Sequence, residues 1–194
     1  MGSILSSLSK TVIAGFVLLA VIVGIFGNIS LVEQAWWAFA FRWLHVMVGV
    51  MWIGLLWYFN FVQIPSMPKI SDEQKPAISK VIAPEALFWF RYSALLTVVT
   101  GLIVAWLNGY GHYALMLGDG YQAIGLGMWI AIIMAINVWF IIWPNQKRAL
   151  GIVEAGQDEK AKSARLAMLT SRTNTLLSVP MLYLMVAQQN VGLG

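Results

Sequence analysis

The chain contains no cysteine in 194 residues. This absence excludes disulfides, thiolate metal ligands, cysteine nucleophiles and covalent attachment of a c-type haem. Charge is also scarce: only 10% of the residues are charged, 60% are hydrophobic, and the mean hydropathy is +0.77. A soluble domain of this length is much less apolar, so we expect an integral membrane protein surrounded by lipid.

The sequence also lacks the short motifs of several enzyme classes. It contains no phosphate-binding loop of the Walker type, no G-x-S-x-G, no H-E-x-x-H and no acidic cluster that would hold a divalent metal. The formal net charge is +4, but Lys and Arg fall in the gaps between apolar runs instead of gathering on one face. We therefore expect no nucleic-acid partner, and the sequence identifies no catalytic residue.

Several long apolar stretches predict an all-α, polytopic bundle of about five transmembrane helices in one domain, residues 1–194. A membrane-spanning helix needs about 20 mostly apolar residues. The last stretch is weaker because it contains Pro180 and several polar residues, and a re-entrant segment there would reduce the count to four. The predicted helices lie near residues 11–31, 36–62, 86–108, 122–143 and 173–189.

The basic residues predict the topology. They concentrate in two loops and next to the first and last spans, whereas the other connections are nearly free of charge. By the positive-inside rule we expect the N-terminus in the cytoplasm and the C-terminus in the periplasm of a bacterial inner membrane. These residues are Lys10, Lys69, Lys75, Lys80, Lys147, Arg148, Lys160, Lys162, Arg165 and Arg172.

Four polar residues within or beside the predicted spans are interpreted as structural. Asn60 and Asn137 have apolar neighbours in sequence, so each amide needs a partner on another helix. Glu85 and Arg91 frame the start of the third span, where an acid in the first turn complements the helix dipole. The polar segment 149–167 predicts either a separate amphipathic helix or an extension of a neighbouring one.

The two histidines of the chain, His45 and His112, are both predicted near the outer side of the membrane. At helical spacing His45 shares a stripe with Arg42 and Gly49. A b-type haem needs an axial imidazole, a small neighbour and a cation for its propionates, and these three residues offer that set. His112 is the candidate for a second iron ligand. The alternatives are a polar interfacial anchor for His112 and a helix-to-helix hydrogen bond for His45.

Four strings together resemble the membrane domain of the membrane-anchored bacterial urate oxidases, also called urate hydroxylases. They are HVMVGVMWIGLLWYFNFVQIP at residues 45–65, APEALFWFRYSALLTVVTGL at 83–102, NVWFIIWPNQKR at 137–148 and RTNTLLSVPML at 172–182. The polar-punctuated strings are more specific than the apolar ones. The resemblance implies a helical membrane domain that, in the family, is followed by a cytochrome c domain and passes electrons from urate toward the respiratory chain.

Because no cysteine can attach a c-type haem, we expect this chain to lack the cytochrome c domain and to need a separate cytochrome c as electron acceptor.

Two functions remain open at this point. The first hypothesis is a haem b redox or electron-transfer protein with His45 as ligand. The second is a non-catalytic accessory subunit of a larger respiratory or photosynthetic membrane complex, with partner subunits packed against its tryptophan-rich helices.

Overall fold

The computed structural model describes residues 2–27, 29–190 and 192–193, and within these ranges it is helical with no strand. This confirms the all-α fold class. The chain divides into two compact units, residues 1–37 and 38–194. Each unit is described by itself below, and the single-domain organisation stays a prediction.

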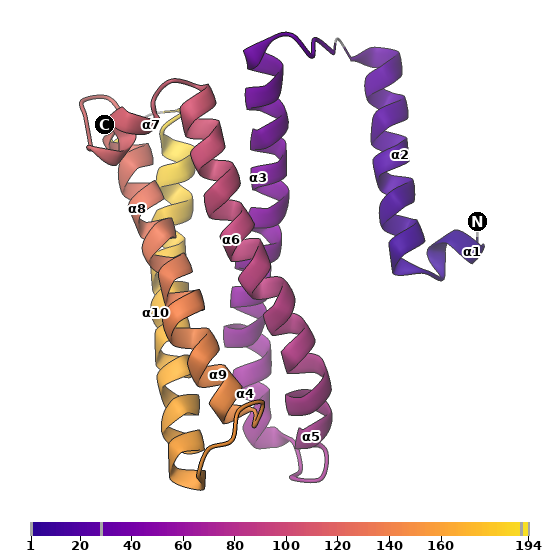
Figure 1. The fold of residues 1–194 in the computed structure, drawn as a ribbon, viewed down its shortest axis with the longest axis vertical. Helices are drawn as coiled ribbons and strands as arrows, with labels where there is room; N and C mark the ends of the chain where they lie inside the picture. Colours follow the sequence, from indigo (N-terminus) through magenta and orange to yellow (C-terminus); the bar gives the residue numbers. More distant parts are fainter. Residues whose placement is uncertain (1, 28, 191, 194) are drawn as a thin grey trace. The chain divides into compact units, whose positions relative to one another are not determined.

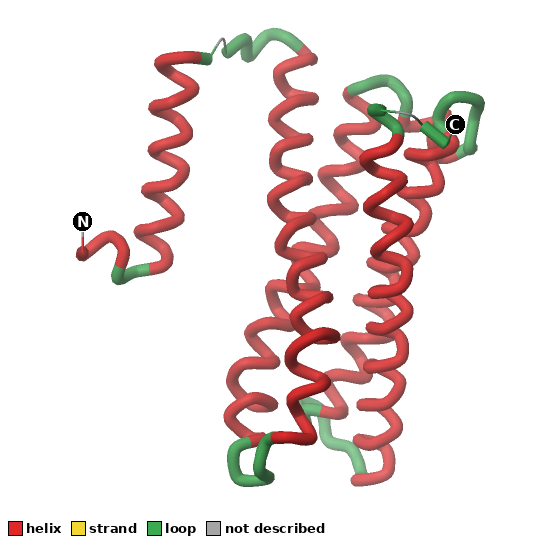
Figure 2. Tube along the Cα trace, turned by 180° about the vertical axis from the view of Figure 1, so that it is seen from behind, coloured by secondary structure: helices red, strands yellow, loops and turns green. Residues whose placement is uncertain are grey.

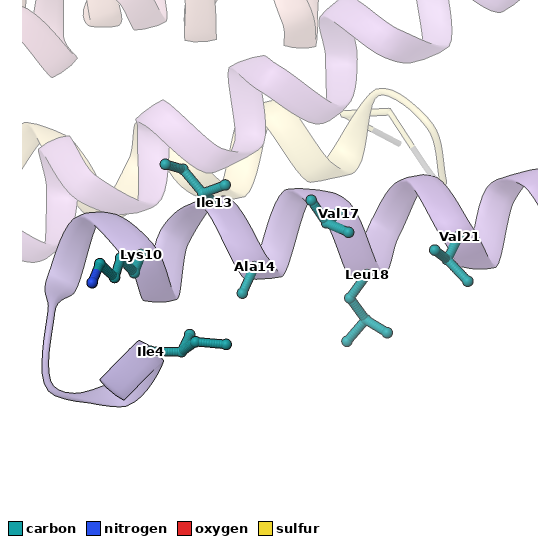
Figure 3. Close-up of a pocket in the computed structure, with 7 residues that line it drawn as sticks. All are labelled: Ile4, Lys10, Ile13, Ala14, Val17, Leu18 and Val21. Atoms are coloured by element: carbon teal, nitrogen blue, oxygen red, sulfur yellow. The ribbon is translucent and has the colours of Figure 1, made fainter. Parts of the chain in front are cut away.

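The first unit contains α1 (Gly2–Leu5) and α2 (Leu8–Phe26). The hydroxyl of Thr11 lies 3.1 Å from Ile4 O and 3.0 Å from Ser7 O, which ties the start of α2 to α1. A shallow depression at this corner has mostly apolar walls (Figure 3). Its lining residues are Ile4, Lys10, Ile13, Ala14, Val17, Leu18 and Val21.

The predicted first helix extended to residue 31, but α2 ends at Phe26. The N–H of Gly27 donates to Val23 O at 2.8 Å while its own backbone is already extended. A Cβ at Gly27 would lie 2.6 Å from Val23 O, so glycine is the residue that closes the helix there.

The second unit is built from long helices and short connecting turns. They are α3 (Gln34–Trp57), which begins in the first unit, η1 (Tyr58–Gln63), α4 (Ile64–Ser66), η2 (Met67–Lys69), α5 (Lys75–Ala77), η3 (Ile78–Ile82), α6 (Ala83–Leu107), α7 (Gly111–Leu115), α8 (Gln122–Ile136), η4 (Asn137–Ile142), α9 (Trp143–Ala149) and α10 (Gln157–Ala187). From Gln157 onward, the polar segment 149–167 is therefore an extension of the last predicted helix, because α10 begins at that residue.

Four helical stretches of the described chain are long and apolar enough to cross a membrane. They are Leu8–Phe26, Gln34–Lys69, Lys75–Leu107 and Gln122–Ala149. The fifth predicted span lies in α10, which is 31 residues long and passes through Pro180 without interruption. Figures 1 and 2 show α10 running beside α8 along the length of the second unit. Because α10 is not among the four stretches found in the described residues, a fifth span stays a prediction.

Three segments, η1, η3 and η4, are π-helical. In each case a proline, Pro65, Pro84 or Pro144, follows the segment by two residues. Proline has no N–H, and its ring collides with the carbonyl four residues earlier in a regular α-helix. The wider π turn relieves that collision while the rest of the helix continues.

The two ends of the second unit differ in charge. Figure 1 places α4, α5 and α9 at one end, and α7 and the C-terminus at the other. We call the first the basic end, because the connections there carry Lys69, Lys75, Lys147 and Arg148. Between the two ends lies an apolar core, whose most buried large side chains are Trp52, Leu56, Phe90, Met134 and Val138.

Candidate functional site

The half-buried imidazole of His45 connects α3 to α6. Its Nδ1 lies 2.9 Å from Thr97 O and 3.3 Å from Thr100 Oγ1. A carbonyl oxygen only accepts, so Nδ1 carries the proton and donates it. The lone pair of the neutral ring is then on Nε2, the nitrogen that remains for a ligand.

Gly101 gives the imidazole access to that carbonyl. In a helix, the side chain at one position covers the carbonyl four residues earlier, here the carbonyl of Thr97. A Cβ at Gly101 would lie 2.8 Å from Cε1 of His45 and 3.1 Å from its Nδ1. The ring therefore occupies the space that the missing side chain leaves, and the predicted stripe on α3 did not include this glycine.

Arg42 and Gly49, the other members of the predicted stripe, also face α6. Arg42 donates from Nη2 to Asn108 Oδ1 at 3.4 Å, at the end of α6. A Cβ at Gly49 would meet the methyl group of Thr97 at 3.8 Å. The structure thus directs the stripe of Arg42, His45 and Gly49 toward a single neighbouring helix.

His112 has a different environment. It is exposed on α7, and its ring centroid lies 6.1 Å from that of Tyr113. Tyr121 stacks between Tyr113 and Tyr110, at 5.9 Å and 5.8 Å. Burial raises the pKa of Tyr110, and the positive charge of Arg42 opposes that rise. This places His112 in an aromatic cluster, whereas His45 is hydrogen-bonded to α6.

The donor set at His45 would suit a residue that holds a haem iron through one imidazole nitrogen. Imidazoles that bind iron commonly donate their other ring N–H to a carbonyl, which fixes the tautomer and the ring orientation. His45 has this arrangement with Thr97, and the guanidinium of Arg42 lies one helical turn away. Within the described residues, no group of three or more His, Asp and Glu side chains comes together as a metal site.

A second polar region lies along one face of α10, and the sequence pattern did not predict it as a unit. Ser171, Asn174 and Ser178 follow one another at helical spacing and are almost fully buried. Asn60 donates to Ser171 Oγ at 2.8 Å, and Trp57 Nε1 donates to Ser178 Oγ at 3.0 Å. These hydrogen bonds attach α10 to the end of α3 and to η1.

The same face of α10 is hydrogen-bonded to α8 and η4. Asn137 donates from Nδ2 to Asn174 Oδ1 at 2.8 Å, and Asn174 donates from Nδ2 to Met134 O at 2.9 Å. Asn60 and Asn137 thus have partners on another helix, as their interpretation as helix contacts requires. The sequence signal for the α10 part of this polar region was the helical spacing of Ser171, Asn174 and Ser178 in an otherwise apolar stretch.

These features define an all-helical protein with several helices of membrane-spanning length. Residues 116–191 match the family model described as Urate oxidase N-terminal. This range contains α8, η4, α9 and α10, and so includes two of the four strings on which the resemblance was based. The chain is therefore related to that family over these residues. Comparison with curated proteins and with solved structures gave no match.

Proposed function

We propose that this chain is the membrane domain of a urate oxidase-like redox system and that it carries a b-type haem on His45. The observation that carries the proposal is the hydrogen bond from Nδ1 to Thr97 O, which presents Nε2 as the ligand nitrogen. A bound haem would let the chain pass single electrons between a small-molecule donor and a separate cytochrome c.

The residues around His45 have defined tasks in this proposal. Thr97 and Thr100 hold the ring orientation, Gly101 lets the ring approach α6, and Arg42 supplies the positive charge for propionates. His112 is the candidate for a second ligand or for contact with the electron acceptor. In a bacterial inner membrane with the basic end in the cytoplasm, His45 would lie toward the periplasm, where a cytochrome c could accept electrons.

The alternative is a non-catalytic accessory subunit of a respiratory or photosynthetic complex. The observation that favours it is the close fit of the His45 ring over Gly101, because a side chain with only a packing role would fill that space in the same way. In this case the exposed tryptophans would contact partner subunits, and the histidine would stabilise the interface between α3 and α6.

The test is a reduced-minus-oxidised optical spectrum of the chain purified in mild detergent, together with His45→Ala, His45→Asn and His112→Ala. Asparagine offers an amide N–H close to the position of Nδ1, so His45→Asn retains a donor for Thr97 O but has no imidazole for iron. Co-purifying proteins are identified in the same preparations.

Under the proposal the wild type shows a b-type haem band that both His45 variants lose, and His45→Asn remains folded. His112→Ala then shows whether a second ligand comes from that residue. A wild-type protein without haem that co-purifies with stoichiometric partners would refute the redox proposal and favour the accessory subunit. A haem band that persists in His45→Asn would refute the assignment of His45.

A further inference from the structure

Near the basic end of the bundle, the guanidinium of Arg91 has no hydrogen-bond acceptor among the described residues. Arg91 lies on α6, two turns from the start of that helix. A guanidinium carries five N–H donors. In the described part of the chain none of these donors makes a hydrogen bond, and Nε is buried without a partner. Arg91 also forms no salt bridge there.

Arg91 is held in place by aromatic rings. Its Cζ lies 3.3 Å from the centroid of the Trp143 ring, 5.9 Å from that of Trp139 and 5.7 Å from that of Tyr92. The backbone is fixed as well, because Trp139 Nε1 donates to Arg91 O at 3.2 Å. Cation–π contacts orient a guanidinium but leave its N–H groups free to bind an anion.

A second cation lies near the same indole. Nζ of Lys147, on α9, is 5.6 Å from the centroid of the Trp143 ring, and it too forms no salt bridge among the described residues. The neighbouring Arg148 is paired with Glu159 at 3.3 Å, and Glu85 accepts from Trp89. Within the described residues, Arg91 and Lys147 thus place two positive charges without an ion-pair partner around one tryptophan.

We propose that Arg91, Trp143 and Lys147 form a binding site for the phosphate of an anionic phospholipid. Trp143 follows roughly 20 residues of apolar helix from Gln122, which puts its ring at a membrane interface. At that depth Arg91 can extend its guanidinium toward the headgroups, whose phosphate oxygens can accept from the two Nη groups, which are not buried as Nε is. The site does not depend on a haem or on any redox activity.

Native mass spectrometry of the delipidated protein in mild detergent tests this site. Phosphatidylglycerol, zwitterionic phosphatidylcholine and inorganic phosphate are titrated separately. The variants are Arg91→Gln, Lys147→Gln and, as a matched control, Lys162→Gln, which removes one exposed positive charge from α10. Thermal unfolding of each variant reports whether it remains folded.

We expect phosphatidylglycerol to bind more tightly than phosphatidylcholine. Arg91→Gln and Lys147→Gln should each weaken phosphatidylglycerol binding roughly fivefold, the effect of one interfacial cation, while Lys162→Gln should leave it unchanged. Equal binding of the two lipids, or equal weakening by all three variants, would overturn the site. Saturable binding of inorganic phosphate without lipid preference would overturn the lipid assignment. If Arg91→Gln does not fold, Lys147→Gln decides the outcome.

Discussion

Replacement of Gly101 by alanine tests how α3 and α6 are held together. The added Cβ would lie 2.8 Å from His45 Cε1, a distance that real Cβ contacts essentially never show. To reach an ordinary contact of 3.4 Å the ring must move by roughly 0.6 Å, the difference between these two values. The ring has little room to do so, since Nδ1 is bound to Thr97 O at 2.9 Å.

The cost arises in one of two alternative ways, and one gain opposes it. If the ring leaves Thr97, an unsatisfied buried donor costs about 1–3 kcal/mol. If the helices separate instead, overpacking of a close contact costs about 1–3 kcal/mol. Alanine also favours the helix over glycine by about 1 kcal/mol. We therefore expect Gly101→Ala to lower the free energy of unfolding by about 0–2 kcal/mol relative to the wild type, which is about 1–3 kcal/mol relative to a Gly→Ala change that meets no clash.

The assay is unfolding by sodium dodecyl sulfate from mild detergent, followed by tryptophan fluorescence. Gly54→Ala is the matched control, because Gly54 also lies within a long helix, on α3, but a Cβ there meets nothing within 4 Å. The control should be as stable as the wild type or slightly more stable. A Gly101→Ala protein as stable as Gly54→Ala would refute the proposed fit of His45 over Gly101.

Three further tests, which use four substitutions, concern other parts of the fold. Asn174→Ala and Asn137→Ala should each destabilise the bundle, and their double-mutant cycle should give a coupling of about 0.6–1.7 kcal/mol, measured by the same unfolding assay. Gly125→Ala should cost about 1–3 kcal/mol there, because its Cβ would overlap the Ala114 carbonyl oxygen and separate α7 from α8. Burial raises the pKa of Tyr110, so its contribution to stability is complete below the ordinary tyrosine pKa and is lost as the pH rises through the raised value. Ultraviolet titration should show a tyrosine that ionises above the ordinary tyrosine pKa, and Tyr110→Phe should remove that signal.

The positions of the long helices could be predicted from the sequence because apolar length is a local property. Their ends were harder, since each depends on a particular backbone contact. The last helix begins at Gln157, whereas the prediction began at residue 173, because the polar residues before 173 continue the same helix. The three π-helical segments each precede a proline, a signal that is visible in the sequence but that predicts a break as readily as a wider turn.

The site could be predicted only in part. Periodicity placed Arg42, His45 and Gly49 on one face of α3, and all three face α6 in the structure. Periodicity on one helix says nothing about which residue of another helix lies opposite. The glycine beside the imidazole is therefore Gly101, 56 positions from His45 in the numbering. The sequence signal for this contact was a glycine with threonine one and four positions before it. A residue without Cβ leaves the carbonyl of Thr97 open to a neighbouring helix.

The two functional hypotheses use different atoms of the same side chain. The hydrogen bond to Thr97 occupies Nδ1, and an iron ligand would use Nε2. A contribution of His45 to bundle stability is therefore compatible with both hypotheses, and a loss of stability in His45→Ala supports neither over the other. The hypotheses separate only when one nitrogen is removed and the other retained. For this reason the decisive comparison is His45→Asn, which keeps a donor for α6 and lacks the ligand.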